Sequence, residues 1–200
     1  MKTVYLGAVI ALACSALSGQ SIASQTRKVI VCTEMDTHAL MGVRPLASAI
    51  FARIGLTIDW RELNSQASCK GSIRVRLSYG PQLIGSSSER LGSADLCEKA
   101  IVLFPERVQE VSPYPGPYVM AHVVAHEIAH VLEGVSRHSS SGIMKARWSQ
   151  EDFIAMRPSG LAFAEEDVEL IYAGLNIGHN RTLTPCEKRE LQPAEKTAYR

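Results

Sequence analysis

The segment from Ala125 to Met144 reads AHEIAHVLEGVSRHSSSGIM, and it carries the pattern that decides the fold. It begins with an HExxH motif, formed by His126, Glu127 and His130. Residues four apart lie on one face of a helix, about 6 Å apart along the axis, so two imidazoles can converge on one zinc ion at about 2.0–2.1 Å. Glu127 is then close enough to take a proton from a zinc-bound water. The motif therefore predicts a helix that presents two metal ligands and a general base.

The residues after the motif offer a third ligand. Gly134 suits the end of the helix and lets the chain reverse, and His138 follows four residues later. A catalytic zinc site has three protein ligands and one open position, whereas a structural site has four protein ligands. We therefore expect His126, His130 and His138 to bind one catalytic Zn²⁺ ion.

Other side chains in the sequence offer alternatives for the same role. A carboxylate in place of His138 would give a thermolysin-like site, and the downstream candidates are Glu151, Glu165 and Glu166. His122 lies about 12 Å along a straight helix from His130, which is too far for both to bind one ion, so we expect His122 to pack or form a hydrogen bond. The sequence leaves open whether Trp148 or Tyr172 lines the cleft.

The motif, the glycine, the third histidine and Gly142-Ile143-Met144 together resemble the metzincin zinc metallopeptidases over residues 121–144. The resemblance implies that Gly134 turns the chain, that His138 completes the site and that Met144 forms a methionine turn beneath the metal. It also implies a zinc metalloendopeptidase that cleaves a protein or peptide substrate by Glu127-assisted attack of zinc-bound water. The spacing departs from the usual HExxHxxGxxH, because the glycine is one residue later and the third histidine two residues later.

Hydrophobic patterning predicts an α+β, zincin-like fold, with a twisted sheet, an early helix, an active-site helix and a small C-terminal helical part. Strands are expected at Lys28–Thr33, Leu56–Trp60, Ser72–Tyr79 and Lys99–Phe104, and helices at Val43–Ile54, Tyr118–Glu133 and Glu165–Gly174. Loops are expected at Gln82–Ser93 and Ser112–Pro117, from Gly134 through Pro158-Ser159-Gly160, and in the polar tail from His179.

The N-terminus is typical of an export signal. Lys2 precedes an apolar run from Val4 to Leu17, and Ser21-Ile22-Ala23 offers small residues for cleavage after Ala23. We therefore expect a signal peptide at 1–23, a single zinc-metallopeptidase-like domain at 24–200, and a secreted or periplasmic protein. Ala11-Leu12-Ala13-Cys14 loosely resembles a lipoprotein signal, so a lipid anchor on Cys14 is the alternative.

Cysteine usage fits an exported domain. Removal of the leader would leave four cysteines, Cys32, Cys69, Cys97 and Cys186, which suggests two disulfides. Three pairings exist, and we expect Cys69 to pair with Cys97, closing a local loop, and Cys32 with Cys186, tying the two ends together. Free buried thiols are the alternative. No two of these cysteines form a CxxC pair, which argues against a four-cysteine zinc site.

Composition narrows the classes of partner. The chain has 200 residues and a formal net charge of +1, so charge gives no reason to expect nucleic acid or an acidic membrane as a partner. No segment of the expected mature domain is long and apolar enough to span a bilayer. A non-catalytic exported binding domain with a structural zinc site is the alternative function. It would have no need of Glu127, so that residue discriminates between the two.

Overall fold

The computed structural model describes residues 27–34, 40–63, 69–80, 90–112, 114, 116–157 and 160–177. The expected leader, Cys14, Cys186 and the tail from His179 lie outside these residues. The strands are β1 Arg27–Thr33, β2 Leu56–Glu62, β3 Ile73–Leu77, β4 Gly92–Asp95 and β5 Ala100–Leu103. The helices are α2 Val43–Ala52, α3 Pro105–Val111, α4 Tyr118–Glu133, α5 Gln150–Ala155 and α6 Glu165–Ile177.

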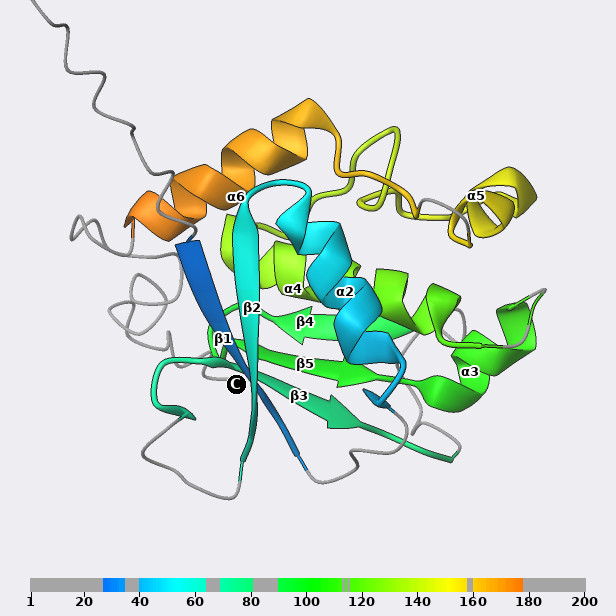
Figure 1. Cartoon of the computed structure of the whole chain (residues 1–200), viewed down its shortest axis with the longest axis horizontal. Coiled ribbons are helices and arrows are strands. Elements are labelled where there is room, and N and C mark those ends of the chain that lie inside the picture. The colour runs from blue at the N-terminus through cyan, green and yellow to red at the C-terminus, as the bar shows by residue number, and fades with distance from the viewer. Residues whose placement is uncertain are drawn as a thin grey trace, which may run out of the picture.

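The five strands form one twisted mixed sheet with the order β2-β1-β3-β5-β4 (Figure 1). Four strands are parallel, and β4 pairs antiparallel with β5, with Gly92 opposite Leu103 and Asp95 opposite Ala100. Parallel strands need apolar side chains because helices cover them, and Val31 and Val75 are almost fully buried. The antiparallel strand β4 forms one edge of this sheet. The helix α4 packs against β4 and β5 at that edge.

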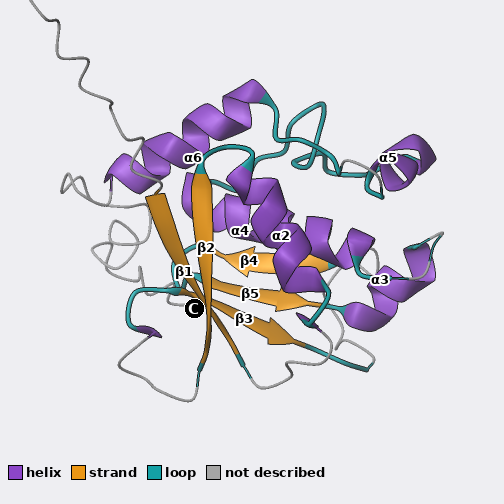
Figure 2. Ribbon diagram, viewed as in Figure 1, coloured by secondary structure: helices purple, strands orange, loops and turns teal. Residues whose placement is uncertain are grey.

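Helices α2 and α4 pack side by side against one face of the sheet, and α6 packs against α4 (Figure 2). The central helix α4 has the bounds expected from the sequence. It contacts the sheet and the helices α2, α3 and α6, so nearly all of its side chains are buried, including the polar His126, Glu127 and His130. The fold thus places the HExxH motif between a sheet edge and the C-terminal part of the chain.

Three elements were missed in the sequence. Strand β4 has the sequence GSAD, which has little strand propensity, and its pairing with β5 decides its conformation. Helix α3 begins at Pro105, which suits the first turn of a helix as well as the end of a strand. Helix α5 begins with a capping box. The Ser149 hydroxyl accepts a hydrogen bond from the amide of Asp152, and the Asp152 carboxylate accepts one from the amide of Ser149. A serine followed three residues later by an acidic residue is a pattern that could have predicted this helix from the sequence.

The expected disulfide pairing is wrong. Cys32 is bonded to Cys69, with the two Cα atoms 6.0 Å apart. Strand β1 lies between β2 and β3, so the connection from β2 to β3 must cross β1, and this brings Cys69 against Cys32. Cys97 is also disulfide-bonded, and Cys186 lies outside the described residues. Distance along the sequence was therefore a poor guide, because the crossover connection decides which cysteines meet.

Within the described part of the chain, no helix has both the length and the apolar character that a membrane crossing requires.

Candidate metal centre

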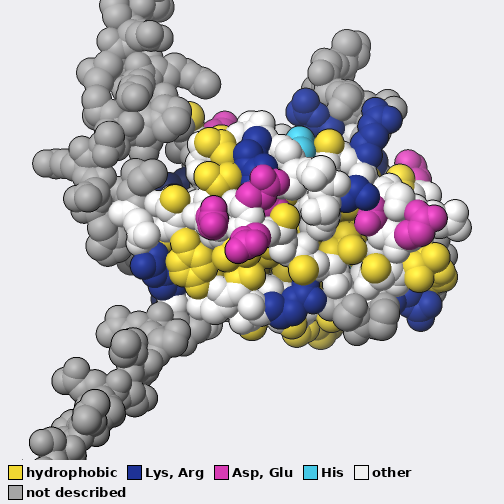
Figure 3. Space-filling model, turned by 90° about the horizontal axis from the view of Figure 1, so that it is seen from above, with side chains coloured by type: hydrophobic (Ala, Val, Ile, Leu, Met, Phe, Trp, Pro, Cys, Tyr) yellow, Lys and Arg dark blue, Asp and Glu magenta, His cyan; other side chains and the backbone are white. Residues whose placement is uncertain are grey.

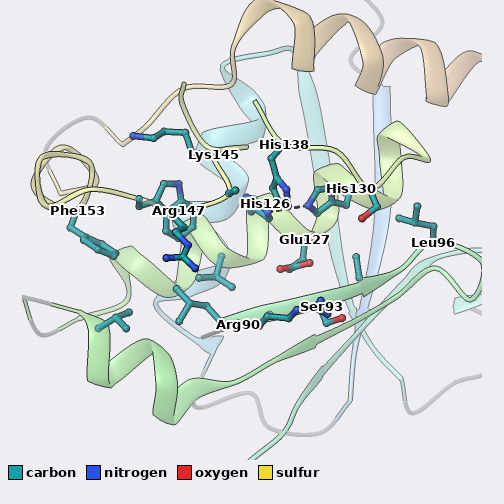
Figure 4. A pocket seen from close by; sticks show the side chains of 18 residues that line it. Arg90, Ser93, Leu96, His126, Glu127, His130, His138, Lys145, Arg147 and Phe153 are labelled. Atoms are coloured by element: carbon teal, nitrogen blue, oxygen red, sulfur yellow. Dashed lines mark hydrogen bonds between the residues drawn. The ribbon is translucent and has the colours of Figure 1, made fainter. Parts of the chain in front are cut away.

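His126, His130 and His138 come together in one cluster (Figure 4). One potential ligand atom from each residue lies within 4.8 Å of the other two. The two helix-borne histidines are buried, whereas His138 comes from the loop after α4 and is exposed. Among the described residues, no carboxylate or cysteine joins this cluster, so the downstream acids Glu151, Glu165 and Glu166 do not take the place of His138.

Backbone carbonyls orient the two helix-borne imidazoles. The Nδ1 of His126 lies 2.9 Å from the carbonyl oxygen of Ile143, and the Nδ1 of His130 lies 3.3 Å from that of Val135. A carbonyl oxygen only accepts, so each Nδ1 carries the proton and each Nε2 keeps its lone pair. The two Nε2 atoms lie 3.0 Å apart, close to the roughly 3.3–3.4 Å expected between two nitrogens on a tetrahedral zinc.

Burial also keeps these imidazoles neutral. It lowers the pKa of both His126 and His130 to about 4, and the hydrogen bonds to the carbonyls only partly oppose that shift. Neutral imidazole is the form that binds a metal ion. The donor set of three histidines, two of them neutral and pre-oriented, therefore fits a catalytic-type zinc site with one open position.

The loop that carries His138 begins at a left-handed helix cap. Gly134 has φ +70°, and its amide donates to the carbonyl of His130 at 3.0 Å. The chain then reverses and forms a bridge between Ser139 and Lys145, in which the amide of Ser139 donates to the carbonyl of Met144 at 2.8 Å. This closed loop brings His138 back to the two histidines of α4, although more residues separate His130 from His138 than in the usual motif.

The segment around the predicted methionine turn is deeply buried. Ile143 and Met144 are fully inaccessible, and the Ile143 amide donates to the carbonyl of Ala162 at 3.0 Å. The carbonyl of Ile143 accepts from the indole Nε1 of Trp148 at 3.2 Å as well as from His126. Gly142 has φ +71°, and a Cβ there would lie 2.3 Å from the Ala162 oxygen. The turn thus holds His126 in place through its backbone.

An ion-pair network ties the His138 loop to α6. Arg137, next to His138, donates to Asp167 at 2.6 Å and to the hydroxyl of Ser139 at 3.1 Å. Ser139 also donates to Asp167, whose side chain is fully buried. Glu133 lies 3.8 Å from the Arg137 Nε, and neither of its buried carboxylate oxygens has a hydrogen-bond partner. Burial therefore raises the pKa of Glu133 to about 7, although Arg137 opposes the rise.

Glu127 lies beside the histidine cluster and faces the cleft (Figure 4). Burial raises its pKa to about 7, with the nearby charge of Arg90 opposing the rise. Strand β4 passes so close that a Cβ on Gly92 would lie 2.8 Å from the Glu127 carboxylate. The absence of a side chain at Gly92 is what admits the carboxylate next to the sheet edge.

The cleft encloses about 560 Å³ and runs between β4 on one side and the His138 loop on the other. Trp148 is part of its lining and meets the His126 ring edge-on, with centroids 5.8 Å apart. The contributions of Arg90, Ser93 and Arg147 to the cleft were missed in the sequence, because β4 itself was not foreseen and no motif marks these residues.

His122 and Tyr172 form hydrogen bonds away from the histidine cluster. The Nδ1 of His122 donates to the carbonyl of Tyr118 at 2.8 Å, and its Nε2 accepts from the amide of Leu161 at 3.0 Å, which confirms a hydrogen-bonding role. The Tyr172 hydroxyl donates to the carbonyl of Ile54 at 2.6 Å and is not part of the cleft lining.

Comparisons with known proteins find similarity in structure only. No protein-family model matches the sequence, and no curated protein matches it. A zinc-dependent peptidase from Methanocorpusculum labreanum (strain Z) superposes with a TM-score of 0.50 at 10% identity, over 71% of this chain and 99% of the other. Archaemetzincin from Methanopyrus kandleri superposes with a TM-score of 0.54 at 12% identity, over 78% of this chain and 99% of the other. The chain therefore has the α+β fold of these zinc-dependent peptidases, and its three histidines form a cluster that fits a zincin-type site.

Proposed function

We propose that this protein is an exported zinc-dependent metalloendopeptidase in which His126, His130 and His138 hold one zinc ion and Glu127 is the general base. The observation that carries the proposal is the placing of a buried carboxylate beside three convergent histidines in an open cleft. A purely structural zinc site would need a fourth protein ligand and would have no use for Glu127.

The edge strand suggests how a substrate binds. Strand β4 borders the cleft and, among the described strands, pairs only with β5, so its outer edge can accept an extended peptide as a further strand. Backbone hydrogen bonds would then hold the peptide with its scissile carbonyl near Glu127 and the histidines. This mode of binding suits protein or peptide substrates of varied sequence.

Zinc, when bound, supplies Lewis-acid polarisation of the scissile carbonyl and activation of water. Glu127 accepts a proton from the attacking water while the water oxygen forms a bond to the carbonyl carbon. The same carboxyl group then gives that proton to the amide nitrogen as the C–N bond breaks, which yields a carboxylate and an amine. The same group can serve both halves of this exchange, because a carboxylate accepts a proton and the resulting carboxylic acid donates it.

Met144 and Gly134 complete the proposed site. Gly134 lets the chain leave α4 in the left-handed conformation, and Met144 fills the buried space next to Ile143, whose carbonyl orients His126. We assign Met144 the role of a packing residue beneath the metal.

Export is proposed from the leader-like residues 1–23 and from the disulfide between Cys32 and Cys69, which suits an oxidising compartment. Expression of the full chain in a bacterium with a periplasm should yield a mature protein that begins at Ser24. Retention of Met1 in the purified protein would contradict a cleaved leader.

The test of catalysis uses Glu127→Gln with Glu169→Gln as the matched control, since Glu169 is exposed on α6. Zinc per chain is measured by elemental analysis, and hydrolysis is measured on a proteome-derived peptide library. We expect about one zinc per chain in all three proteins and loss of hydrolysis only in Glu127→Gln. Full activity of that variant would refute the assigned base, and zinc without hydrolysis in the wild type would favour the non-catalytic binding domain.

A further inference from the structure

One backbone carbonyl beside the histidine cluster accepts two hydrogen bonds from side chains. The carbonyl oxygen of Ile143 accepts from the Nδ1–H of His126 at 2.9 Å and from the indole Nε1–H of Trp148 at 3.2 Å. A carbonyl oxygen has two lone pairs, so it can accept from both donors at once. Because the first hydrogen bond sets the plane of the imidazole, the second one, which limits how far the carbonyl can turn, also acts on His126.

The indole meets the same imidazole directly. The ring centroids of Trp148 and His126 lie 5.8 Å apart, and the two rings are nearly perpendicular, at 86°. Contacts between the edge of one ring and the face of another depend on the angle between them. Trp148 therefore contacts both the imidazole and the carbonyl to which that imidazole donates, and a rotation of His126 would disturb both contacts.

The segment that carries Trp148 is itself fastened to helix α5. An ion pair between Lys145 and Asp152 joins the start of the segment to the helix. Phe153, also on α5, meets Trp148 edge to face, with centroids 6.2 Å apart. Lys145 and Phe153 lie on the same side of His126 (Figure 4). The indole is thus held by its neighbours on the side of His126 where α5 lies.

The imidazole that Trp148 supports is buried. Among the described histidines only His138 is exposed, and lysine and arginine side chains gather beside a histidine on the face seen in Figure 3. His126 and Ile143 are both buried, whereas Trp148 is half-buried and lines the cleft. The orientation of a buried metal ligand depends on the protein groups that its second ring nitrogen contacts.

We propose that Trp148 is a positioning residue for the metal centre. Its indole N–H fixes the carbonyl of Ile143, and this carbonyl then holds the imidazole of His126 in the orientation that binds zinc. The inference rests on the proposed function in taking His126 as a zinc ligand. Loss of the indole N–H should loosen His126 and leave His130 unaffected, because the Nδ1 of His130 donates to a different carbonyl, that of Val135.

The chain offers a matched control, because it has two tryptophans. Trp60 lies on β2, at the opposite edge of the sheet from β4, and its Nε1 donates to the hydroxyl of Ser48 at 2.8 Å. Trp148→Phe and Trp60→Phe therefore each remove one indole hydrogen bond, the first beside the histidine cluster and the second far from it.

Two measurements on the full-length mature protein compare these variants. Competition with a chromogenic chelator gives the zinc affinity, and the visible absorption bands of the Co²⁺-loaded protein report the geometry of the ligands. We expect Trp148→Phe to weaken zinc binding by about 10-fold, as loss of support around a ligand does, and to shift the Co²⁺ bands. Trp60→Phe should change neither quantity.

A second replacement removes the N–H and keeps the shape of the ring. In the Trp60→Phe protein Trp148 is the one remaining tryptophan, so growth on benzothienylalanine puts sulfur in place of its indole N–H. The zinc affinity should fall as in Trp148→Phe. Heteronuclear NMR of the metal-free protein locates the proton of His126. We expect it on Nδ1 in the wild type and shared between the two ring nitrogens in the benzothienyl protein.

The outcomes separate this inference from the proposed function. An unchanged zinc affinity, Co²⁺ spectrum and His126 proton in the benzothienyl protein would overturn the positioning role, even if Trp148→Phe fails to fold. Equal changes in Trp60→Phe would overturn it as well. A wild-type protein that binds no zinc would overturn the proposed function, and the NMR measurement on the metal-free protein would still decide whether Trp148 orients His126.

Discussion

The two halves of the histidine cluster are built in different ways. His126 and His130 are four residues apart on one buried helix, so regular helix geometry alone places them together. His138 lies on a loop whose position depends on contacts between residues far apart in the sequence, through Ile143 to Ala162 and Arg137 to Asp167. The helical half is therefore pre-organised by local structure, whereas the loop half depends on the packing of α6 and the segment before it.

The largest expected effect separates the helix-borne ligands from the loop-borne one. His130→Ala should weaken zinc binding by more than about 100-fold, because it leaves one rigid ligand and one on a loop. His138→Ala should weaken it by about 10- to 100-fold, because the pre-oriented pair on α4 remains. Competition with a chromogenic chelator measures both, and His122→Ala is the control because His122 is outside the cluster. Equal losses in the two ligand variants would show that the loop is as rigid as the helix.

The second effect tests what holds the loop. Asp167→Asn should lower the free energy of unfolding by about 3 kcal/mol, because it leaves the half-buried Arg137 without its closest carboxylate. It should also reduce zinc affinity by about 10-fold or more through the misplacing of His138.

Glu166→Gln is the matched control, since Glu166 is 59% exposed and lies 3.5 Å from Arg137, and it should change stability by less than about 1 kcal/mol. Denaturant unfolding of the metal-free protein gives the first quantity, and chelator competition gives the second. A loss of stability with unchanged zinc affinity would show that Asp167 supports the fold but does not position His138.

A third comparison uses two glycines with almost the same backbone angle. Gly134 and Gly142 have φ of +70° and +71°, so alanine is strained at both by about 1 kcal/mol. At Gly134 a Cβ would meet nothing within 4 Å, whereas at Gly142 it would lie 2.3 Å from the Ala162 oxygen. Gly142→Ala should therefore cost about 1–3 kcal/mol more than Gly134→Ala in denaturant unfolding. Equal costs would mean that the 142–162 contact relaxes easily and does not fix the turn.

The smallest effect concerns Glu133, a buried residue at the C-terminal end of α4. Its pKa is raised from the ordinary 4.5 to about 7, so the folded protein holds a proton that the unfolded chain releases between these values. Ionised Glu133 thus lowers stability above pH 7, and this penalty disappears as the pH falls toward 4.5. Glu133→Gln should raise the stability of the metal-free protein by about 1–2 kcal/mol at pH 8 and by much less at pH 5. The same gain at both pH values would contradict a titration of Glu133 in this range.

Some of the molecule follows from local sequence patterns. The HExxH spacing on an apolar helix ended by Gly134 was enough to predict α4 with its bounds and the convergence of His126 and His130. Alternating or continuous β-branched residues were enough to locate β1, β2, β3 and β5, because these signals arise within a few neighbouring residues. His138 was foreseen as a third ligand by its type and its distance from the helix end, and the cluster in the structure includes it.

Tertiary structure alone decided the rest. The short strand GSAD became β4 because β5 offers it hydrogen bonds, and no propensity in those four residues would show it. The sheet order brought Cys69 across β1 to Cys32, which counting along the chain could not reveal. Arg90 and Arg147 border one cleft only because that edge strand and the His138 loop face each other. Local patterns specify a helix and the two histidines on one of its faces, since these depend on neighbours along the chain. The charge and the walls of the cleft depend instead on which distant segments pack together.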